Sequence, residues 1–224
     1  MKALAIIPAR GGSKRIPKKN IKLFSGKPII AYSVEIALNS GLFEEVMVST
    51  DDKEIAEIAL KCGARVPFFR TKGTANDTAP LNDVLKEVLN KYKEQNETFD
   101  FVCLILPTAP LIKPENLLKG LNMLKNSSFD SVRPIVKFSF PVQRAFRLTK
   151  KNEVLPFNPE DFKKRSQDLE PAYHDSGQFY WIKGNRDLSG NKGAFEISEL
   201  EAQDIDNETD WKLAELKYKL LFGR

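Results

Sequence analysis

The sequence predicts an α/β fold, in which a mostly parallel sheet carries helices on both faces. Along the first half of the chain, short apolar runs alternate with longer amphipathic segments. The runs at 3–8 and 101–106 are apolar throughout, which is typical of strands buried on both sides. A chain of 224 residues can bury roughly 70–75% of its unfolded surface, so it needs no disulfide or metal to fold. We expect one domain over residues 1–224.

The predicted elements alternate in type along the chain. Strands are expected at 3–8, 45–50, 64–69 and 101–106, and helices at 28–40, 53–62, 80–94 and 113–125. Pro28 and Pro114 suit first turns of helices, Asp51 or Asp52 suits an N-cap, and Gly41 follows a helix end. In parallel sheets, ligands bind at the carboxyl ends of the strands. The loops after the first and fourth strands should therefore meet at the binding edge.

The alternation ends near Phe138. Residues 138–182 are rich in aromatic residues and prolines and contain no long amphipathic segment. They are interpreted as short antiparallel strands and loops outside the main sheet, with a β-rich arm at about 138–172. Such an arm exposes apolar surface unless it packs on a partner subunit. A last helix capped by Asn207 is expected to bury a set of apolar residues, Trp211, Leu213, Leu216, Leu220 and Leu221.

Composition limits the classes of function. The formal net charge is +5, but the cations concentrate at 10–22 and 150–165. Localised charge favours a small anionic ligand over nucleic acid, which stays open as an alternative. Cys62 and Cys103 have no CxxC spacing and fit a reducing compartment. The first apolar run is too short for a signal peptide or a membrane span, so we expect a cytoplasmic protein with no membrane partner.

The loop "ARGGSKRIPKKN" at 9–20 follows the first predicted strand. It matches neither GxxxxGK[ST] nor GxGxxG, and His174 is the only histidine, which leaves no His/Cys metal cluster. Its glycines let backbone N–H groups approach an anion, and Arg10, Lys14 and Lys19 add charge-assisted contacts to phosphate oxygens. The alternative is a solvated basic turn.

This loop resembles the opening motif of the CMP-sialic acid synthetases, cytidylyltransferases that activate nonulosonic acids. The resemblance continues through "GKPIIAYSVEIALNSGLFEEVMVSTDD" and "LPTAPLI", while "RSQDLEPAYHDSGQFYW" and "QDIDNETDW" resemble the pseudaminic acid branch. It implies a Rossmann-like, three-layer nucleotidyltransferase fold, CTP and a nonulosonic acid as substrates, Mg²⁺, and a homodimer whose arms cross. It implies no nucleic-acid partner.

The resemblance also implies roles for residues. The CTP site would comprise Ala9, Arg10, Gly11, Gly12, Ser13, Lys14, Lys19, Asn20, Arg70, Thr108 and Ala109. The sugar acid would contact Arg165, Tyr173, His174, Asp175 and Gln178. Asp204 and Asp206 would bind the metal, and the catalytic candidates are Arg10, Lys14, Lys19 and Asp175.

The implied reaction is attack of the anomeric 2-hydroxyl of the sugar acid on the α-phosphate of CTP, with pyrophosphate leaving. Such chemistry depends mainly on positioning and charge stabilisation. A D-x-D pair in extended backbone places both carboxylates on one side, although one aspartate of the pair could instead cap the last helix. Asp175 could orient hydroxyls, take a proton or add charge near the metal, and His174 fits a packed structural role.

Two points stay open in the sequence. Sialic acid enzymes have P-T-S-P-L-R after the fourth strand, whereas this chain has "PTAPLIK" with Ile112 in place of the arginine. The pseudaminic branch often has A-T-A-P-F there, so this loop is intermediate and does not assign the sugar. The resemblance of the two later segments makes pseudaminic acid the leading substrate, followed by legionaminic and N-acetylneuraminic acid. A catalytically dead binder of the same fold is the other alternative.

The aromatic run before Ile182 is interpreted as strand alternation, with Phe179 and Trp181 sharing one face.

Overall fold

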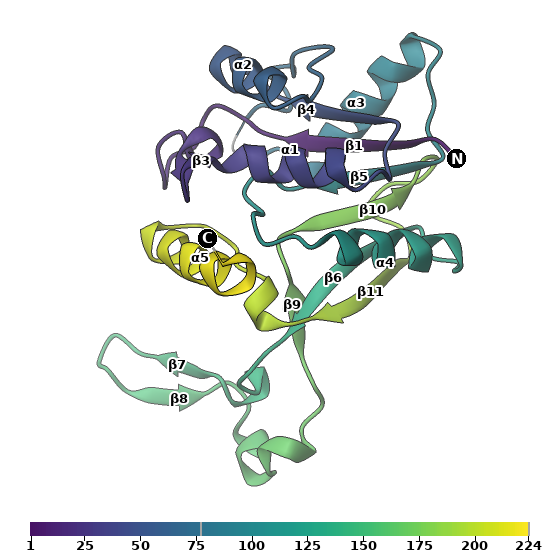
Figure 1. The fold of residues 1–224 in the computed structure, drawn as a ribbon. Helices are drawn as coiled ribbons and strands as arrows, with labels where there is room; N and C mark the ends of the chain where they lie inside the picture. Colours follow the sequence, from purple (N-terminus) through teal and green to yellow (C-terminus); the bar gives the residue numbers. More distant parts are fainter. Residues whose placement is uncertain (77, 224) are drawn as a thin grey trace.

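The computed structural model describes residues 1–76 and 78–223 and has an α/β architecture around a mixed sheet (Figure 1). The main sheet contains β1 (Ala3–Pro8), β4 (Glu45–Ser49), β5 (Phe101–Ile105), β6 (Ser131–Lys137), β9 (Tyr173–Asp175), β10 (Phe179–Lys183) and β11 (Lys192–Ile197). The helices are α1 (Ile29–Asn39), α2 (Lys53–Lys61), α3 (Leu81–Glu94), α4 (Pro114–Lys125) and α5 (Glu208–Phe222). Two small hairpins are formed by β2 (Leu23–Phe24) with β3 (Lys27–Pro28) and by β7 (Phe146–Leu148) with β8 (Val154–Pro156).

The sheet is mixed rather than mostly parallel, which corrects the sequence-based expectation. Its order is β11-β6-β10-β5-β1-β4, with β9 paired to β6. Strand β1 is parallel to β4 and β5, and β11 is parallel to β6, but β10 runs antiparallel between β5 and β6. The segment 179–182 thus belongs to the centre of the sheet and not to an excursion. Its four consecutive buried residues are the pattern of a strand covered on both faces.

Helices cover both faces of the sheet, so the predicted layering is confirmed. Helices α1, α2 and α4 pack on one face, against alternate residues of the strands, and α3 packs on the other face. Phe179 and Trp181 lie on the first of these faces, and Tyr180 lies on the second, as the alternation predicted. The indole N–H of Trp181 donates to the carbonyl oxygen of Leu117 at 3.0 Å, which ties α4 to the central strand.

Several local predictions are confirmed by the helix ends. Asp52 caps α2 by accepting hydrogen bonds from two backbone N–H groups, and Asn207 forms a capping box with Asp210 at the start of α5. Pro114 occupies the first turn of α4. The strand expected at 64–69 is reduced to an isolated bridge between Met47 and Arg65, because a proline two residues later cannot donate to a ladder.

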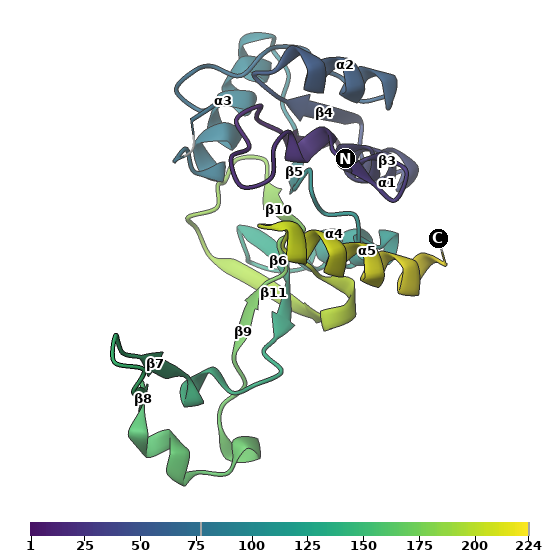
Figure 2. The same cartoon turned by 90° about the vertical axis from the view of Figure 1, so that its left-hand side faces the viewer.

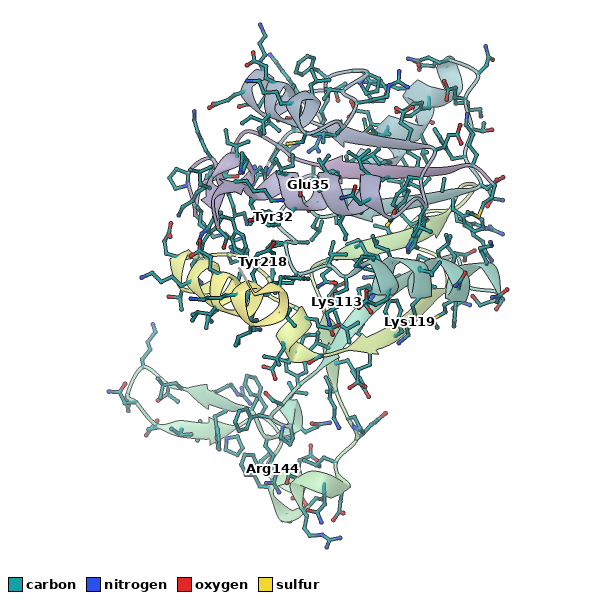
Figure 3. All side chains as sticks on the ribbon, viewed as in Figure 1. Tyr32, Glu35, Lys113, Lys119, Arg144 and Tyr218 are labelled. Carbon is teal, nitrogen blue, oxygen red and sulfur yellow. The ribbon has the colours of Figure 1, made fainter. Side chains whose placement is uncertain are left out.

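The burial predicted for the last helix is wrong for three leucines. Trp211 and Ala214 are buried, and they pack with Tyr32 and Tyr218 against α1, as Figure 3 shows for the two tyrosines. The side chains of Leu213, Leu216 and Leu220 instead point into solvent, with exposed fractions of 42%, 60% and 76%. The inward stripe of α5 is therefore an aromatic one, offset from the leucine stripe.

Residues 138–172 extend away from the body of the molecule below β9 in Figure 1, and Figure 2 shows the same separation after a quarter turn. The strands β7 and β8 form one hairpin there, and the described remainder of the segment is short 3₁₀ turns and loops. The segment is thus less rich in strand than expected. None of the described helices has both the length and the apolar character needed to cross a membrane.

We expect replacement of Gly184 by alanine to destabilise the fold by about 1–3 kcal/mol or more, as overpacking does. Gly184 follows β10, and a Cβ there would lie 1.7 Å from the carbonyl oxygen of Phe99. Gly73→Ala is the control, because its Cβ would approach no atom closer than 3.8 Å. Urea unfolding measures both variants, and equal stability of the two would contradict the packing at Gly184.

Candidate active site

The loop after β1 is held in shape by its neighbours. The N–H of Ala9 donates to the carbonyl oxygen of Ser49 at 2.9 Å, and the side-chain amide of Asn20 donates to the carbonyl oxygen of Arg10 at 2.9 Å. The N–H of Gly11 donates to a carboxylate oxygen of Asp51 at 3.0 Å. This N–H is therefore engaged within the protein, which limits the backbone nest predicted for the loop.

Gly11 is required by a close approach. A Cβ at this position would lie 2.6 Å from a carboxylate oxygen of Asp52, the N-cap of α2. Any larger residue would push the loop away from the helix or disrupt its cap. Gly12 faces less crowding, since its Cβ would stay 3.4 Å from the guanidinium of Arg10.

Most of the predicted CTP residues surround one cavity of about 260 Å³ at the carboxyl ends of β1 and β5. Its polar lining includes the predicted residues Arg10, Ser13, Lys14, Lys19, Asn20, Arg70, Thr108 and Asp204. Apolar side chains that the sequence analysis did not assign, Leu81, Val84 and Leu106, form part of its wall. Ala109 lies in the core instead, and Ala9, Gly11 and Gly12 support the loop without lining the cavity.

Arg70 brings a buried cation to this cavity. Its guanidinium donates to the hydroxyl of Ser49 at 3.2 Å and to the carbonyl oxygen of the same residue at 2.7 Å. Burial lowers the pKa of Arg70, and the nearby charge of Arg10 lowers it further, while Asp51 and Glu87 oppose the shift. The two arginines repel each other, so an anion between them is electrostatically favoured.

The predicted metal pair lies beside the cationic loop. Asp204 lines the cavity, and Asp206 is paired with Arg15 at 2.6 Å. Between them Ile205 is fully buried, and its carbonyl oxygen accepts a hydrogen bond of 2.6 Å from the ammonium of Lys19. Because Asn207 is the helix cap, the alternative in which one aspartate of the pair serves as the cap does not hold.

The acid pair is electrostatically strained. Loss of hydration raises the pKa of Asp204, and the charge of Asp206 raises it further, whereas Lys19 lowers it. Burial also lowers the pKa of Lys19, although both aspartates oppose that shift. A carboxylate whose ionised form is disfavoured by a neighbouring carboxylate suits a divalent cation.

The donor set fits magnesium. Magnesium takes oxygen ligands and is commonly held by one or two carboxylates together with substrate phosphates and water. Asp204 and Asp206 supply two carboxylates, and within the described ranges no group of three or more potential ligand side chains gathers anywhere. Phosphate oxygens and water would therefore complete the coordination.

Asp175, a predicted sugar ligand and catalytic candidate, is held from several sides. One carboxylate oxygen accepts from the N–H of Gly177 at 2.9 Å, and the other accepts from Arg133 at 3.0 Å. The phenol of Tyr180 lies near this carboxylate, since burial and the charge of Asp175 both raise its pKa. Gly177 has a φ of 67°, and a Cβ placed there would lie 3.5 Å from the Cβ of Asp204, so the turn passes close to the second aspartate.

Arg133 was missed by the sequence analysis. The sequence does show an arginine inside the apolar run "SVRPIV", which is unusual for a buried strand. Its contact with Asp175, however, depends on the register between β6 and β9, and β9 lies far along the chain from β6. Arg133 also stacks on Tyr180, with 4.7 Å between the guanidinium carbon and the ring centroid.

Four other predicted sugar residues lie away from the cavity. His174 pairs with Val136 and contacts the ring of Phe138, so it faces the opposite side of the sheet from Asp175. Tyr173 is exposed and lies near Glu196. Gln178 is buried, and Arg165 lies in the arm, paired with Asp168 at 2.7 Å.

Gln178 has a structural role in the segment that leads to the metal pair. Its side-chain amide donates to the backbone carbonyl of Glu201, whose carboxylate is bound by Lys113 at 2.6 Å and by Asn116 at 3.1 Å. Figure 3 shows Lys113 at the start of α4. This network fixes the chain three residues before Asp204.

Comparison with known proteins identifies the class. The model of the cytidylyltransferase family matches residues 4–195. The pseudaminic acid cytidylyltransferase of Campylobacter jejuni is 42% identical, with 98% of this chain and 97% of the relative covered. The CMP-N,N'-diacetyllegionaminic acid synthase of Legionella pneumophila is 36% identical, with 96% and 95% covered.

A solved structure of CMP:2-keto-3-deoxy-manno-octonic acid synthetase complexed with CTP has a TM-score of 0.72, with 19% identity and full coverage of both chains, which supports the fold. The chain belongs to the cytidylyltransferase family, as its motifs predicted. It is a CTP-dependent nucleotidyltransferase.

We expect Asp204→Asn to raise the melting temperature of the metal-free protein. The raised pKa means that the fold disfavours the ionised carboxylate, so at neutral pH the amide removes an unfavourable charge. The difference should fade as the pH falls towards about 4, where the carboxyl becomes protonated.

Asp187→Asn is the matched control and should lower the melting temperature. Its carboxylate accepts hydrogen bonds from the hydroxyl and N–H of Ser189, which lower its pKa and make the ionised form stabilising at neutral pH. Differential scanning fluorimetry with chelator measures both variants. A lower melting temperature for Asp204→Asn would contradict the electrostatic description of the pair.

Proposed function

We propose that this enzyme transfers CMP from CTP to the anomeric hydroxyl of pseudaminic acid and releases pyrophosphate. The observation that carries the proposal is the single cavity that brings Arg10, Lys14 and Lys19 to face Asp204. The relative from C. jejuni supports pseudaminic acid as the sugar. The relative from L. pneumophila makes a legionaminic acid the second candidate.

We assign different roles in the reaction to different residues of the cavity. We assign Arg10 and Lys14 to the triphosphate, where they stabilise charge that builds on the departing pyrophosphate. We assign the buried Arg70, together with Thr108, to the nucleoside. Asp204 and Asp206 would hold Mg²⁺, which supplies positive charge to the phosphates.

Lys19 orients the acid pair. Its ammonium is fixed on the carbonyl oxygen of Ile205, so its charge stays between the phosphate loop and the two carboxylates. We assign Asp175 to the orientation of sugar hydroxyls rather than to proton abstraction, because both of its carboxylate oxygens already accept hydrogen bonds from the protein.

The alternative of a nucleic-acid-binding domain is disfavoured by the placement of the charge. The cations of the loop line a cavity together with carboxylates instead of forming a continuous basic surface. CTP with Mg²⁺ should raise the melting temperature through binding to the folded state, whereas DNA and RNA should not.

The direct test is pyrophosphate release from CTP and Mg²⁺ with a panel of nonulosonic acids. We expect pseudaminic acid to give the highest kcat/KM. Turnover with an N,N'-diacetyllegionaminic acid in preference to pseudaminic acid would move the substrate assignment to the second candidate. Failure of the whole panel would overturn the proposal.

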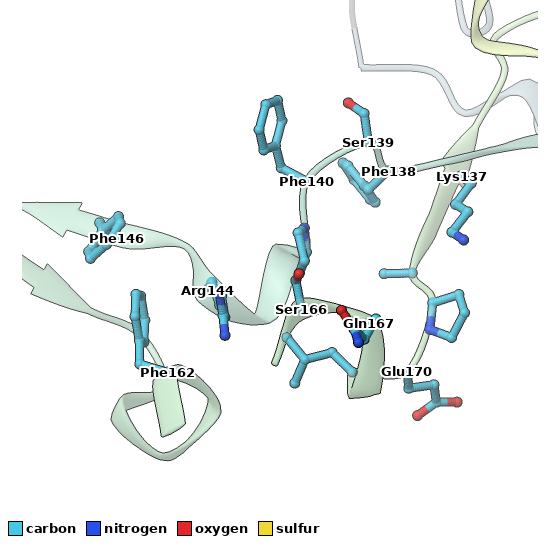
Figure 4. A pocket seen from close by; sticks show the side chains of 14 residues that line it. Lys137, Phe138, Ser139, Phe140, Arg144, Phe146, Phe162, Ser166, Gln167 and Glu170 are labelled. Atoms are coloured by element: carbon cyan, nitrogen blue, oxygen red, sulfur yellow. The ribbon is translucent and has the colours of Figure 1, made fainter. Parts of the chain in front are cut away.

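We also propose a homodimer built through the arm. Apolar side chains of the arm are exposed, including Phe140 at 84% and Leu148 at 71%. A hollow of about 840 Å³ lies beside them, and Figure 4 shows Phe138, Phe140, Phe146 and Phe162 around it. Exposed apolar surface of this kind marks an interaction site. Crossed arms would also bring Arg165 to the cavity of the other subunit.

Lys14→Ala should lower kcat/KM for CTP by about 10²-fold, the loss typical of one charge-stabilising donor. Lys125→Ala, at the end of α4, is the control for removal of a surface lysine. Pyrophosphate release at subsaturating CTP measures both variants. An unchanged rate for Lys14→Ala would contradict the assignment of the loop to the triphosphate.

Mixing two inactive variants tests the crossed arms. Lys14→Ala and Arg165→Ala, unfolded and refolded together, should recover about a quarter of the wild-type sites, because each mixed dimer then holds one complete site. If Arg165 acts within its own subunit, the mixture should stay as inactive as its components.

A further inference from the structure

An open sheet face lies next to the acid pair. Ile135 of β6 is paired with Asp175 of β9, and side chains of paired residues share a face. Arg133, two residues earlier on β6, lies on this same face, while its neighbour Val132 is buried on the side of α4. The charged residues of this face reach solvent, since the side chain of Asp175 is 36% exposed and that of Arg133 is 23% exposed.

Tyr180 lies on this face, and its phenol is close enough to Asp204 to be affected by the charge of that residue. Trp181 pairs with Val132 on the α4 side, so Tyr180 and Arg133 point to the opposite side together. Burial raises the pKa of the Tyr180 phenol, and the charges of Asp175 and Asp204 raise it further. The neutral phenol is therefore favoured at this position, and its ring stacks against Arg133.

We infer that Arg133 is a positioning residue for the sugar acid, which it serves by holding Asp175 and Tyr180 on the open face of β6 and β9, beside the CTP cavity. This inference rests on the proposed function. The nonulosonic acid then lies on that face, with its anomeric hydroxyl directed towards the α-phosphate at Asp204.

The geometry separates this role from nucleotide binding. Arg133, Asp175 and Tyr180 are absent from the lining of the CTP cavity. Asp204 belongs to that lining and lies close to the turn at Gly177, where an added Cβ would be 3.5 Å from it. A sugar whose hydroxyl attacks the α-phosphate must lie on a surface adjoining Asp204. The face that carries Asp175 adjoins it through that turn.

The balance of charge around Asp175 depends on Arg133. Asp175 and Asp204 both carry negative charge near Tyr180, and Arg133 is the cation in direct contact with Asp175. Removing one partner of a partly buried pair leaves the other charge uncompensated. Without Arg133, Asp175 would turn towards solvent and the sugar would lose an oriented acceptor.

The first experiment compares Arg133→Met, Arg133→Lys and Arg186→Met. Arg186 forms an ion pair with Asp130 at 3.1 Å on a distant loop, so Arg186→Met removes a similar pair outside the site. We expect Arg133→Met to raise KM for the sugar roughly tenfold or more, with KM for CTP within about twofold of wild type. Lysine keeps the charge and should recover most of the loss, and Arg186→Met should change neither constant.

Outcomes of this comparison separate the inference from the proposed function. Parallel changes in both KM values and kcat, or an unchanged sugar KM in Arg133→Met, overturn the role of Arg133 alone. A wild-type enzyme that is inert towards every nonulosonic acid overturns the proposed function and this role together.

A second measurement does not depend on turnover. Unfolding equilibrium constants of Arg133→Met, Asp175→Asn and the double variant form a cycle. We expect the product of the two single-variant effects on the unfolding equilibrium constant to differ from the effect of the double variant by about fivefold or more, as it does for residues that interact directly. Effects that simply multiply would show that Arg133 does not hold Asp175 and would overturn the inference.

Discussion

A hydrogen bond of 2.6 Å from the ammonium of Lys19 to the carbonyl oxygen of Ile205 joins segments that lie 186 residues apart. Beneath it, the Ile205 side chain is fully buried with Ile16, Phe24 and Trp211. Because Ile205 points inward, Asp204 and Asp206 point outward beside the cationic loop. The cavity, the acid pair and the start of α5 all depend on this junction.

The mixed sheet explains how the two proposed substrates would meet at this junction. The parallel strands β1 and β5 end at the loops that line the CTP cavity. The antiparallel strands β9 and β10 approach from the other half of the sheet, and the turn between them places Asp175 near Asp204 through Gly177. One edge thus carries the cavity that we propose for the nucleotide, and the neighbouring face is the one that we propose for the sugar acid.

Local features of the site were predictable from the sequence, and long-range ones were not. The apolar run of β1, the cap at Asp52 and the capping box at Asn207 depend on residues close in sequence, and each is confirmed. The central position of β10 depends on which strands flank it, and local periodicity does not encode that choice. The contact of Arg133 with Asp175 has the same origin, as it requires the register of β6 and β9.

The leucines of α5 show a second limit. A periodic apolar stripe predicts that one face is covered, but not by which surface, and Leu216 and Leu220 are exposed in the single chain. Motif resemblance predicted residues of the site that local periodicity does not. It placed Arg10, Lys14 and Asp204 around one cavity, but it also assigned His174, which faces the other side of the sheet.

The most direct test of the junction is calorimetric titration of CTP with and without Mg²⁺, in the wild type and in an Asp204→Asn/Asp206→Asn double variant. We expect Mg²⁺ to strengthen CTP binding to the wild type by roughly tenfold or more, and the double variant to lose most of that gain. An equal Mg²⁺ dependence in both proteins would contradict a joint metal and nucleotide site at this junction.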